Sequence, residues 1–411
     1  MKILHILPYV PIPTHFGGAL RVFHLLKHSA HHHEATVLAY GPPEKEAELR
    51  AALGPGLQRS VLLPRPLARV YRRLGQFYSL WTNHSYFYYV GHTKDMQEAI
   101  NACCAEEQFD IIQTEFSTMG SFDLPSGAVK ILDAHNVEYD NFRRMALNGH
   151  TTLRSFFYKQ EFTKSFFEEL DACKRHDAMF VTSDRDKTMF DEHLPALRKF
   201  VIPNGVDTTY FHPAQAQPRP FSIVFTGMMG YVPNYDGMLY FLDVVFPLIR
   251  RKIPQATVTI VGDKPPESLL KRRSKNVTVT GFVEDVRPYV WNSSVYVVPL
   301  RMGSGTRLKV LEAMAMEKPI VTTSIGCEGI DVKHGESAMI VDEPEAFAEA
   351  VVELFGNTSL RQTLTANGRE LVRQQYEWSV IGRQMEHAYH SLCSGERVER
   401  QMGGAIIHEE L

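Results

Sequence analysis

The chain has 411 residues, of which 44 % are hydrophobic and 22 % charged, and its formal net charge at pH 7 is -3. This length exceeds that of one compact domain, and the composition is that of a globular protein with a sizeable buried core. The slightly acidic balance argues against a dedicated nucleic-acid-binding protein, which would be strongly basic.

Cysteine usage and the N-terminus indicate the compartment. The five cysteines are scattered, with neither a CxxC pair nor metal-ligand spacing, which is typical of a reducing compartment. The first residues, MKILHILPYVPIP, carry one lysine and a short apolar run that Pro8 interrupts, unlike a signal peptide. No run reaches the roughly 18 apolar residues of a membrane span. We therefore expect a cytoplasmic protein.

Short apolar, β-branched runs alternate with segments of helical period along the whole chain. In the first half, strands are expected at 2–7, 35–40, 60–64, 109–115, 129–134 and 178–183. In the second half, strands are expected at 221–227, 256–262, 277–283, 295–300, 319–323 and 338–342. Unalternated runs of this kind are typical of parallel strands buried on both faces, so the fold class is predicted to be α/β.

A proline-rich segment, HPAQAQPRP at 212–220, separates the two halves and has the composition of a linker. We predict an N-terminal Rossmann-like domain over 1–212, a linker over 213–220 and a C-terminal Rossmann-like domain over 221–375. Two doubly wound domains place the carboxyl ends of their strands along a cleft between them, where ligands bind. The last residues, 395–411, are expected to form a loosely held tail.

The segment RMGSGTRLKVLEAMAM, at 301–316, sets a loop with two glycines between a buried strand and an amphipathic helix. Free N–H groups at a helix N-terminus attract an anion, and glycine lets a ligand approach the backbone closely. The loop lacks the Gly-Lys-Ser/Thr of a Walker loop, and Leu308 replaces the third glycine of a dinucleotide fingerprint. On loop chemistry alone, phosphate binding and a plain strand–helix turn fit equally well.

Three charged residues follow this loop. At about 100° per residue, Lys309 and Glu312 share one face of the predicted helix, whereas Arg307 points roughly opposite to Lys309. The two cations therefore cannot both reach one ligand from the helix body, although Arg307 in the first turn can bend into the cleft. The alternative interpretation is a surface ion pair between Lys309 and Glu312.

Five motifs together resemble those of the retaining glycosyltransferases of family four, which have the GT-B fold. They are GGALRVFHLL (17–26), VIPNGVDTTYFHP (201–213), VTGFVEDVRPY (279–289), LKVLEAMAMEKPIVTT (308–323) and YEWSVIGRQMEHAYHSL (376–392). The resemblance covers nearly the whole chain and implies a terminal helix, 376–394, that crosses back onto the first domain. It implies a hexosyltransferase-type enzyme that moves a sugar from a nucleotide-sugar donor to a hydroxyl acceptor with retention of configuration. It implies no metal and no cofactor.

The resemblance also implies roles for individual residues. Glu312 would accept hydrogen bonds from the ribose hydroxyls, the amides of Gly17 and Gly18 would meet the diphosphate, and His135 would lie beside the donor sugar. His135, Arg307 and Lys309 are the predicted catalytic residues. The other predicted donor-binding residues are Gly227, Gly281, Phe282, Val283, Arg301, Gly303, Ser304, Gly305 and Thr306.

The chain departs from the family pattern in two places. Ser304 stands eight residues before Glu312, where the family usually has a glutamate that contacts the sugar. After the first strand of the second domain, Met228 and Asn234 or Asp236 stand where the family usually has an arginine and a lysine. A leaving diphosphate needs cationic or amide stabilisation. We hypothesise that the charge has moved to Arg301, Arg307 and Lys309.

Two further motifs have competing explanations. The SDRD sequence at 183–186 contains a metal-binding Asp-x-Asp, but Ser183 as a helix N-cap with Asp186 as its capping-box partner is favoured. The histidines at 24, 28, 31, 32 and 33 include an i,i+4 pair, yet no carboxylate completes a zinc motif such as His-Glu-x-x-His. A solvated helix end is therefore the favoured interpretation of the histidines.

Residues 65–92 are basic and rich in aromatic side chains. Such a surface suits an anionic membrane or a lipid-linked acceptor, and a helical hairpin packed on the sheet fits equally well. The expected partners are a nucleotide-sugar donor and a saccharide or lipid-linked acceptor, without nucleic acid, with peripheral attachment to the inner face of the membrane through this segment. Cell-surface polysaccharide or glycoconjugate biosynthesis is the process that the family suggests.

Two other functions stay open. One is a nucleotide-sugar 2-epimerase, which would need carboxylates around the sugar. The other is a non-catalytic GT-B-like subunit that binds a nucleotide sugar or a partner glycosyltransferase, which Ser304 in place of glutamate keeps open. The presence of Glu312, His135 and the Gly17–Gly18 pair argues for an enzyme.

Overall fold

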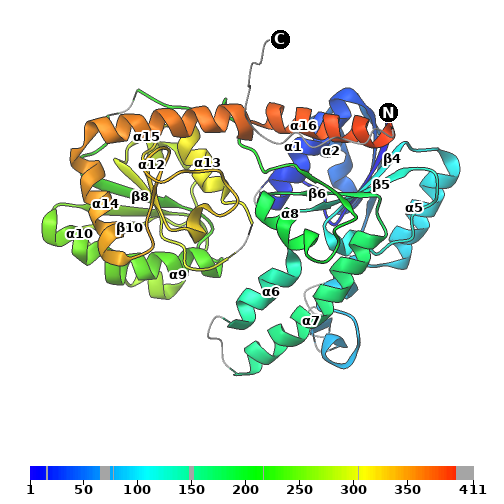
Figure 1. The fold of residues 1–411 in the computed structure, drawn as a ribbon, viewed down its shortest axis with the longest axis horizontal. Helices are drawn as coiled ribbons and strands as arrows, with labels where there is room; N and C mark the ends of the chain where they lie inside the picture. The colour runs from blue at the N-terminus through cyan, green and yellow to red at the C-terminus, as the bar shows by residue number, and fades with distance from the viewer. Residues whose placement is uncertain are drawn as a thin grey trace, which may run out of the picture.

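The computed structural model describes residues 1–14, 17–64, 75–76, 78–147, 152–215, 217–303 and 305–394. Within these ranges it contains two parallel sheets wrapped by helices (Figure 1). The first sheet comprises β1 (Lys2–Leu7), β2 (Glu34–Tyr40), β3 (Leu57–Leu63), β4 (Ile111–Glu115), β5 (Val129–Ala134), β6 (Ala178–Val181) and β7 (Arg198–Val201). Their order is β3-β2-β1-β4-β5-β6-β7.

The helices of the first domain are α1 (Gly17–His32), α2 (Glu46–Leu53), α4 (Tyr86–Gly91), α5 (Lys94–Glu106), α6 (Glu138–Leu147), α7 (Thr152–Lys174) and α8 (Asp184–Asp191), with short turns η1 (Pro43–Lys45) and η2 (Ser117–Met119). Helices α6 and α7 form a hairpin that projects away from the rest of the domain (Figure 1). Residues 65–74 and 77 of the predicted basic segment lie outside the described residues.

The second sheet comprises β8 (Ser222–Thr226), β9 (Thr257–Val261), β10 (Val277–Val279), β11 (Val295–Val298), β12 (Ile320–Thr322) and β13 (Met339–Ile340), in the order β10-β9-β8-β11-β12-β13. Its helices are α9 (Val232–Tyr240), α10 (Phe246–Lys252), α11 (Glu267–Leu270), α12 (Arg287–Trp291), α13 (Leu308–Ala315), α14 (Pro344–Gly356) and α15 (Thr358–Leu371), with π-helical segments η3 (Phe241–Val245) and η5 (Val372–Tyr376) and a 3-10 turn η4 (Ile325–Cys327). The predicted α/β class with two doubly wound parallel sheets is confirmed.

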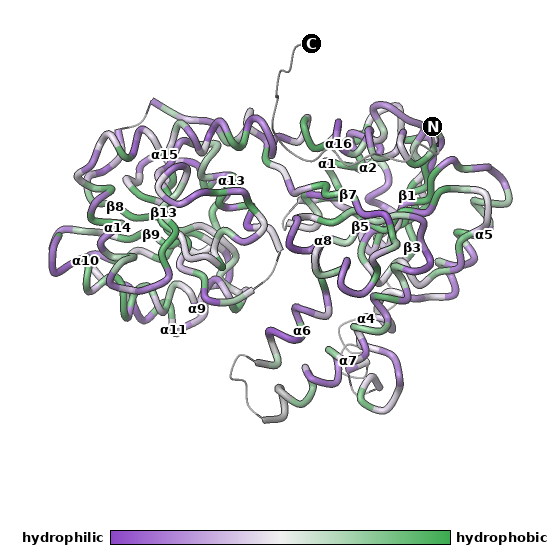
Figure 2. Tube along the Cα trace, in the orientation of Figure 1, coloured by the Kyte–Doolittle hydropathy of each residue, from purple (hydrophilic) through white to green (hydrophobic). Residues whose placement is uncertain are grey.

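Burial explains why these runs form parallel strands. Ile3, Leu4, Ile6 and Leu7 of β1 are fully buried, although successive side chains of a strand point to opposite faces. Both faces of the sheet must therefore be covered, as in a doubly wound domain. Figure 2 shows this as hydrophobic strands inside and hydrophilic helix faces outside.

The last helix, α16 (Trp378–Cys393), returns to the first domain and packs on α1 (Figure 1). Its buried residues share a core cluster with β1 and α1, and the Tyr389 hydroxyl donates to Gln113 Oε1 on β4 at 2.5 Å. The chain thus passes between the domains twice. The two passages touch, because Val206 N donates to Tyr376 O at 2.7 Å.

Glycine is required where the passages meet. A Cβ on Gly205 would lie 2.8 Å from the Trp378 ring and 2.9 Å from Tyr376 O, so no larger residue fits. The proline-rich segment that follows is attached to the second domain: Trp291 Nε1 donates to His212 O at 2.8 Å, and Arg219 N donates to Asn292 O at 2.9 Å.

Candidate functional site

The N-termini of two helices from different domains meet in the structure. Helix α1 begins at Gly17 and α13 begins at Leu308. A Cβ on Gly17 would lie only 3.2 Å from Leu308 Cδ1, so the first turn of α1 approaches α13 closely. A helix N-terminus carries a partial positive charge and N–H groups without partners within the helix, which together attract anions. In α13, Leu308 N and Val310 N donate to Thr306 O and Arg307 O, at 3.2 and 2.8 Å.

The glycine-rich loop before α13 faces the first domain. Gly303 and Gly305 have φ of +113° and +78°, in the left-handed region that favours glycine. A Cβ on Gly305 would lie 2.4 Å from Asn136 Oδ1, in the loop that follows β5. Within the described ranges, Thr306 Oγ1 is shielded from solvent and has no hydrogen-bond partner. Ser304, the predicted replacement of the family's glutamate, lies outside these ranges.

The Lys309 side chain lies between residues of β8 and α9. Its Nζ donates to Asn234 Oδ1 at 2.7 Å and lies 4.1 Å from the centre of the Phe225 ring. Asn234 Nδ2 in turn donates to Met228 O at 2.9 Å, which fixes the orientation of the amide. Burial lowers the pKa of Lys309 to about 7. The side-chain nitrogen of Lys309 thus lies beside Asn234, one of the two residues that can stand where the family usually has a lysine.

Glu312 lies one turn further along α13. Burial raises its pKa to about 7, and the nearby Lys309 opposes part of this shift. Lys309 and Glu312 both lie among the described residues and form no ion pair with each other, because the Lys309 side chain donates to Asn234 instead. The alternative of a surface pair is therefore wrong. Glu312 is left as a partly buried acceptor.

The two arginines of this region differ. Arg301 pairs with Asp236, with Nη2 at 2.8 Å from Oδ1, and its guanidinium lies 4.7 Å from the centre of the Tyr240 ring. Arg307 is buried and precedes α13 as its N-cap, so it is not in the first helical turn. Its Nε donates to Ile325 O at 3.3 Å, and its Nη2 would lie 3.1 Å from a Cβ on Gly303, so the guanidinium lies against the glycine-rich loop. Burial lowers the pKa of Arg307.

Three glycines line the carboxyl ends of β8, β9 and β10. Gly227 has φ of +153°, and a Cβ there would lie 2.6 Å from Lys309 Nζ. A Cβ on Gly262 would lie 1.7 Å from Gly227 O, and Gly262 N donates to Gly281 O at 3.1 Å. β10 ends before Gly281, whose φ is +80°, so the predicted strand over 277–283 is too long. Phe282 beyond it is exposed, whereas Val283 packs on the core.

His135 belongs to a buried network at the end of β5. Its Nε2 lies 2.7 Å from Glu115 Oε2, and its ring stacks on Phe116 at 3.7 Å. Beside it, Arg21 of α1 forms a bidentate salt bridge with Asp133, with Nε–Oδ2 and Nη2–Oδ1 distances of 3.0 and 2.8 Å. Burial lowers the pKa of His135 to about 3 and raises that of Glu115 to about 7. The imidazole is therefore neutral at physiological pH.

One nitrogen of this imidazole is unused by the protein. His135 is 5 % exposed, and its Nδ1 has no hydrogen-bond partner among the residues that the structure describes. Buried polar atoms of this kind are nearly always paired, with protein, water or ligand. His135 therefore offers a free ring nitrogen beside the loop that carries Asn136.

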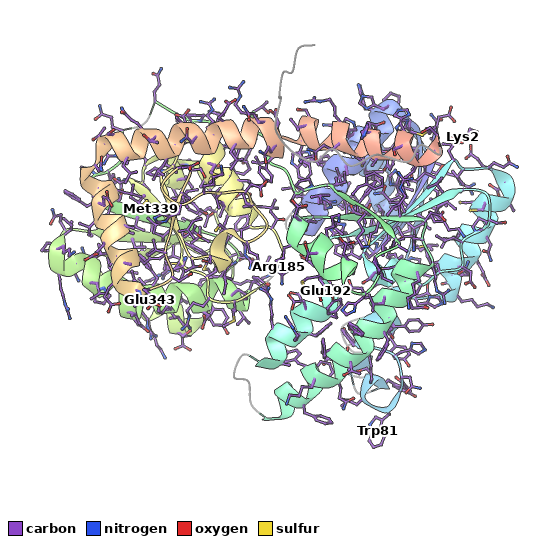
Figure 3. All side chains as sticks on the ribbon, viewed as in Figure 1. Lys2, Trp81, Arg185, Glu192, Met339 and Glu343 are labelled. Atoms are coloured by element: carbon purple, nitrogen blue, oxygen red, sulfur yellow. The ribbon has the colours of Figure 1, made fainter. Side chains whose placement is uncertain are left out.

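Two arginines of the first domain hold one glutamate of the second. Arg144 of α6 donates to Gly303 O at 2.7 Å and to both carboxylate oxygens of Glu328, at 2.9 and 3.0 Å. Arg185 of α8, labelled between the domains in Figure 3, lies 2.9 Å from Glu328 Oε1. Asp140 pairs with both arginines, at 2.8 and 2.6 Å. This bridge fixes the glycine-rich loop against the first domain.

The sequence did not reveal this bridge or the Arg21–Asp133 pair. Arg21 lies inside the GGALRVFHLL motif, and Asp133 lies within the apolar run 129–134, so a charged residue among apolar neighbours was the available signal. Arg144, Arg185 and Glu328 carry no such signal, because they are ordinary surface residue types in three distant segments.

The Asp-x-Asp sequence begins helix α8. Ser183 Oγ accepts from Asp186 N at 3.2 Å, so the predicted N-cap is confirmed. Among the described residues, the Asp186 carboxylate accepts from the Thr182 hydroxyl at 2.8 Å and not from Ser183 N, so the capping-box part of the prediction is wrong.

Comparisons with known proteins show what the chain is similar to. Residues 220–357, most of the second domain, match the family described as glycosyl transferases group 1. A 44.6 kDa protein in the cps region of Klebsiella pneumoniae is 22 % identical over 60 % of this chain and 65 % of its own length. The capsular polysaccharide biosynthesis glycosyltransferase CapM of Staphylococcus aureus is 28 % identical over 40 % of this chain. This match covers 46 % of CapM, so the chain spans less than two thirds of either relative.

Solved structures show the fold over nearly the whole chain. HepE from Anabaena, in complex with UDP, superposes with a TM-score of 0.68 over 95 % of this chain and 100 % of its own, at 13 % identity. The architecture of the two sheets is therefore that of the GT-B glycosyltransferase structures.

Proposed function

We propose that this protein is a glycosyltransferase that moves a sugar from a nucleotide-sugar donor to a hydroxyl acceptor. The proposal rests on the meeting of the α1 and α13 N-termini. Gly17 lies against Leu308, and Lys309 is the next residue of α13. A diphosphate is the anion that suits two converging helix N-termini and a lysine. The group 1 domain and the GT-B fold, which HepE with bound UDP shares, support this ligand.

The proposed donor site distributes the parts of the nucleotide along one edge of the second sheet. Two acceptor oxygens of Glu312 suit the vicinal hydroxyls of a ribose. The amides of Gly17, Gly18, Gly303, Ser304, Gly305 and Thr306 would hold the diphosphate. The backbone of 281–283, at the end of β10, would lie along the base.

Relocated positive charge would balance the diphosphate. Lys309 contacts Asn234 and Arg301 contacts Asp236, and one of these two residues stands where the family usually has a lysine. This contact supports the hypothesis that charge has moved from α9 to the glycine-rich loop and α13. Because Lys309 and Arg307 would stabilise the leaving diphosphate themselves, we propose transfer without a metal ion or other cofactor.

His135 would act at the sugar. Its neutral imidazole presents Nδ1, and the bond from Nε2 to Glu115 fixes the ring. We propose retention of configuration, with the leaving phosphate assisting attack of the acceptor on the same face of the sugar. Closure of the two domains through Arg144 and Glu328 would exclude water from this step.

The acceptor would approach from the α6–α7 side, in peripheral contact with a membrane. No helix among the described residues combines the length and apolarity needed to cross a bilayer. Trp81 and Phe167 are nevertheless 78 % and 66 % exposed, and Figure 3 shows Trp81 at the edge of this projection. Exposed aromatic side chains suit a membrane interface, so we propose attachment to the inner face of the membrane and a lipid-linked or saccharide acceptor in cell-surface polysaccharide synthesis.

A thermal-shift panel of UDP, GDP, ADP and dTDP tests the donor site. A nucleotide at about 100 times its dissociation constant stabilises the fold by about 2.7 kcal/mol. One nucleotide should shift the wild type and the control Glu353→Gln, an exposed glutamate of α14, but not Glu312→Gln. The shift should persist in EDTA.

Turnover then separates an enzyme from its alternatives. The nucleotide sugar with the matching base should release nucleoside diphosphate when crude lipid or polysaccharide acceptor is added. Binding without release would favour the non-catalytic subunit, and conversion of the donor sugar without acceptor would favour the epimerase. No shift with any nucleotide would refute the donor site.

A further inference from the structure

Two histidines of α1 and one glutamate of α16 form a cluster that the donor site does not use. His28 and His32 are one turn apart on α1, and their rings stack at 4.4 Å. Glu386 reaches them from α16, more than 350 residues later in the chain. One possible ligand atom from each residue lies within 4.8 Å of the other two. The carboxylate that a local zinc motif lacks is therefore supplied by the fold.

Two atoms of this cluster face each other without a partner. His28 Nε2 lies 3.5 Å from Glu386 Oε1. Within the described ranges, both atoms are shielded from solvent and neither makes a hydrogen bond. Two ligands of a tetrahedral Zn²⁺, with bonds of about 2.0–2.2 Å, lie about 3.4 Å apart. The separation is thus that of two ligands on one metal ion.

Neighbouring contacts orient the other ligand atoms. His32 Nδ1 lies 3.0 Å from the carbonyl oxygen of His28. Because a carbonyl only accepts, Nδ1 carries the proton and Nε2 of His32 keeps its lone pair. His33 Nε2 lies 2.7 Å from Glu386 Oε2, which leaves Oε1 directed at His28. Such outer contacts commonly hold metal ligands in place.

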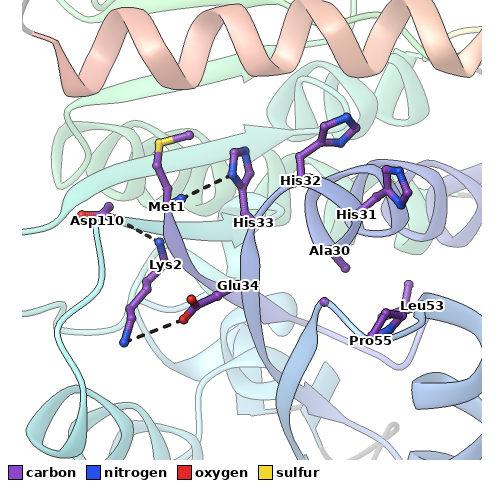
Figure 4. A pocket seen from close by; sticks show the side chains of 11 residues that line it. Met1, Lys2, Ala30, His31, His32, His33, Glu34, Leu53, Pro55 and Asp110 are labelled. Carbon is purple, nitrogen blue, oxygen red and sulfur yellow. Dashed lines mark hydrogen bonds and ion pairs between the residues drawn. The ribbon is translucent and has the colours of Figure 1, made fainter.

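The cluster lies where α16 presses on α1. A Cβ on Gly382 would lie 2.2 Å from His28 Nδ1, so the two helices touch at this point. Figure 4 shows His31, His32 and His33 at the end of α1, with α16 passing above them. The histidines border a surface pocket of about 630 Å³, which gives an ion access to His32.

We propose that His28, His32 and Glu386 bind one divalent transition-metal ion of the zinc class, with water as a further ligand. Two imidazoles and one carboxylate are a ligand set that Zn²⁺ accepts, and water completes the tetrahedron. The ion fastens α16 to α1 and so stabilises the attachment of the C-terminal helix to the first domain. This site is independent of the proposed nucleotide site.

Isothermal titration of untagged, chelator-treated protein with ZnCl₂ tests the site, together with thermal melting. Wild type should bind one Zn²⁺ per chain and melt at a higher temperature with Zn²⁺. His32→Ala and Glu386→Gln should weaken binding at least about tenfold and lose the thermal shift. His31→Ala is the matched control, because His31 is an exposed histidine of the same helix outside the cluster.

His32→Ala keeps the test decisive if Glu386→Gln is unstable, since His32 is exposed and its printed hydrogen bond and ring contacts are to residues 28–33 of the same segment. Equal loss in His31→Ala and His32→Ala, or no stoichiometric binding by wild type, would overturn the proposal. The nucleotide-dependent thermal shift should be the same in His32→Ala and wild type, so failure of the metal site and failure of the donor site are distinguishable.

Discussion

Replacing Lys309 by methionine tests whether this lysine becomes charged when it meets the diphosphate. In the ligand-free protein, burial lowers the pKa of Lys309 to about 7, so the neutral amine dominates above that pH. A diphosphate beside the amine favours the ammonium form and returns the pKa toward its ordinary value. Binding therefore takes up a proton above pH 7, and affinity should fall as the pH rises.

The size of this effect follows from the two pKa values. If the pKa in the complex is 9 or higher, affinity of the wild type should fall about 25- to 50-fold between pH 7 and pH 9, since each pH unit is about 1.4 kcal/mol. Glu312 has the opposite sign, because ionisation above its pKa of about 7 improves it as an acceptor for the ribose. That gain is at most about twofold over the same range.

Titration calorimetry with the nucleoside diphosphate that the thermal-shift panel identifies measures the affinity and its dependence on pH. Lys309→Met should weaken binding at pH 7 by about 10- to 150-fold, the loss of one hydrogen bond to a charged group, and should remove the decline with pH. Lys318→Met is a matched control, because Lys318 is also buried with its pKa lowered, to about 8, but donates to Trp291 O. An equally steep pH dependence in wild type and Lys309→Met would refute the reasoning.

Three further substitutions test the geometry of the site and of its sheet. Arg144→Ala removes the bonds to Gly303 O and Glu328, and we expect a larger radius of gyration in small-angle scattering and at least tenfold slower turnover, about 1.4 kcal/mol. Arg143→Ala, which loses only the contact to Asp140, should change neither. Gly17→Ala places a Cβ 3.2 Å from Leu308 and should weaken nucleotide binding without lowering the melting temperature, whereas Gly356→Ala, in open space, should leave binding intact. Gly262→Ala combines φ of +152° with a Cβ 1.7 Å from Gly227 O and should cost more than about 3 kcal/mol of stability in chemical denaturation, and a loss below about 1 kcal/mol would contradict the packing.

Local pattern was enough to predict most of the sheets. Runs such as 2–7 and 129–134 are visible because most of their residues are apolar and buried on one face of the sheet or the other. Strand β7 (Arg198–Val201) was missed, because its sequence RKFV begins with two charged residues and all four are only partly buried. β10 and β13 are shorter than predicted, since backbone geometry and not hydrophobicity ends them.

The candidate site was predictable only where a motif is local. Glu312, Lys309 and the glycine-rich loop lie within a few residues of one another, so their spacing carries information. The partners of these groups come from elsewhere: Asn136 faces Gly305, Asn234 faces Lys309, and Glu386 faces His28. Contacts of this kind depend on how whole domains and helices are placed, which no spacing in the sequence records.

The double passage of the chain between the domains determines how they can move. A single connecting segment would let the two domains both bend and twist relative to each other. Here the hydrogen bond from Val206 N to Tyr376 O joins the two passages in a parallel bridge, and Gly205 packs against the Trp378 ring. Two coupled passages resist twisting of one domain relative to the other. Rotation of the domains about one axis is then the motion that costs the least free energy. At each closure of the domains, Arg144 and Arg185 would then pair with Glu328 again. The same atoms of the protein would contact the nucleotide in every catalytic cycle.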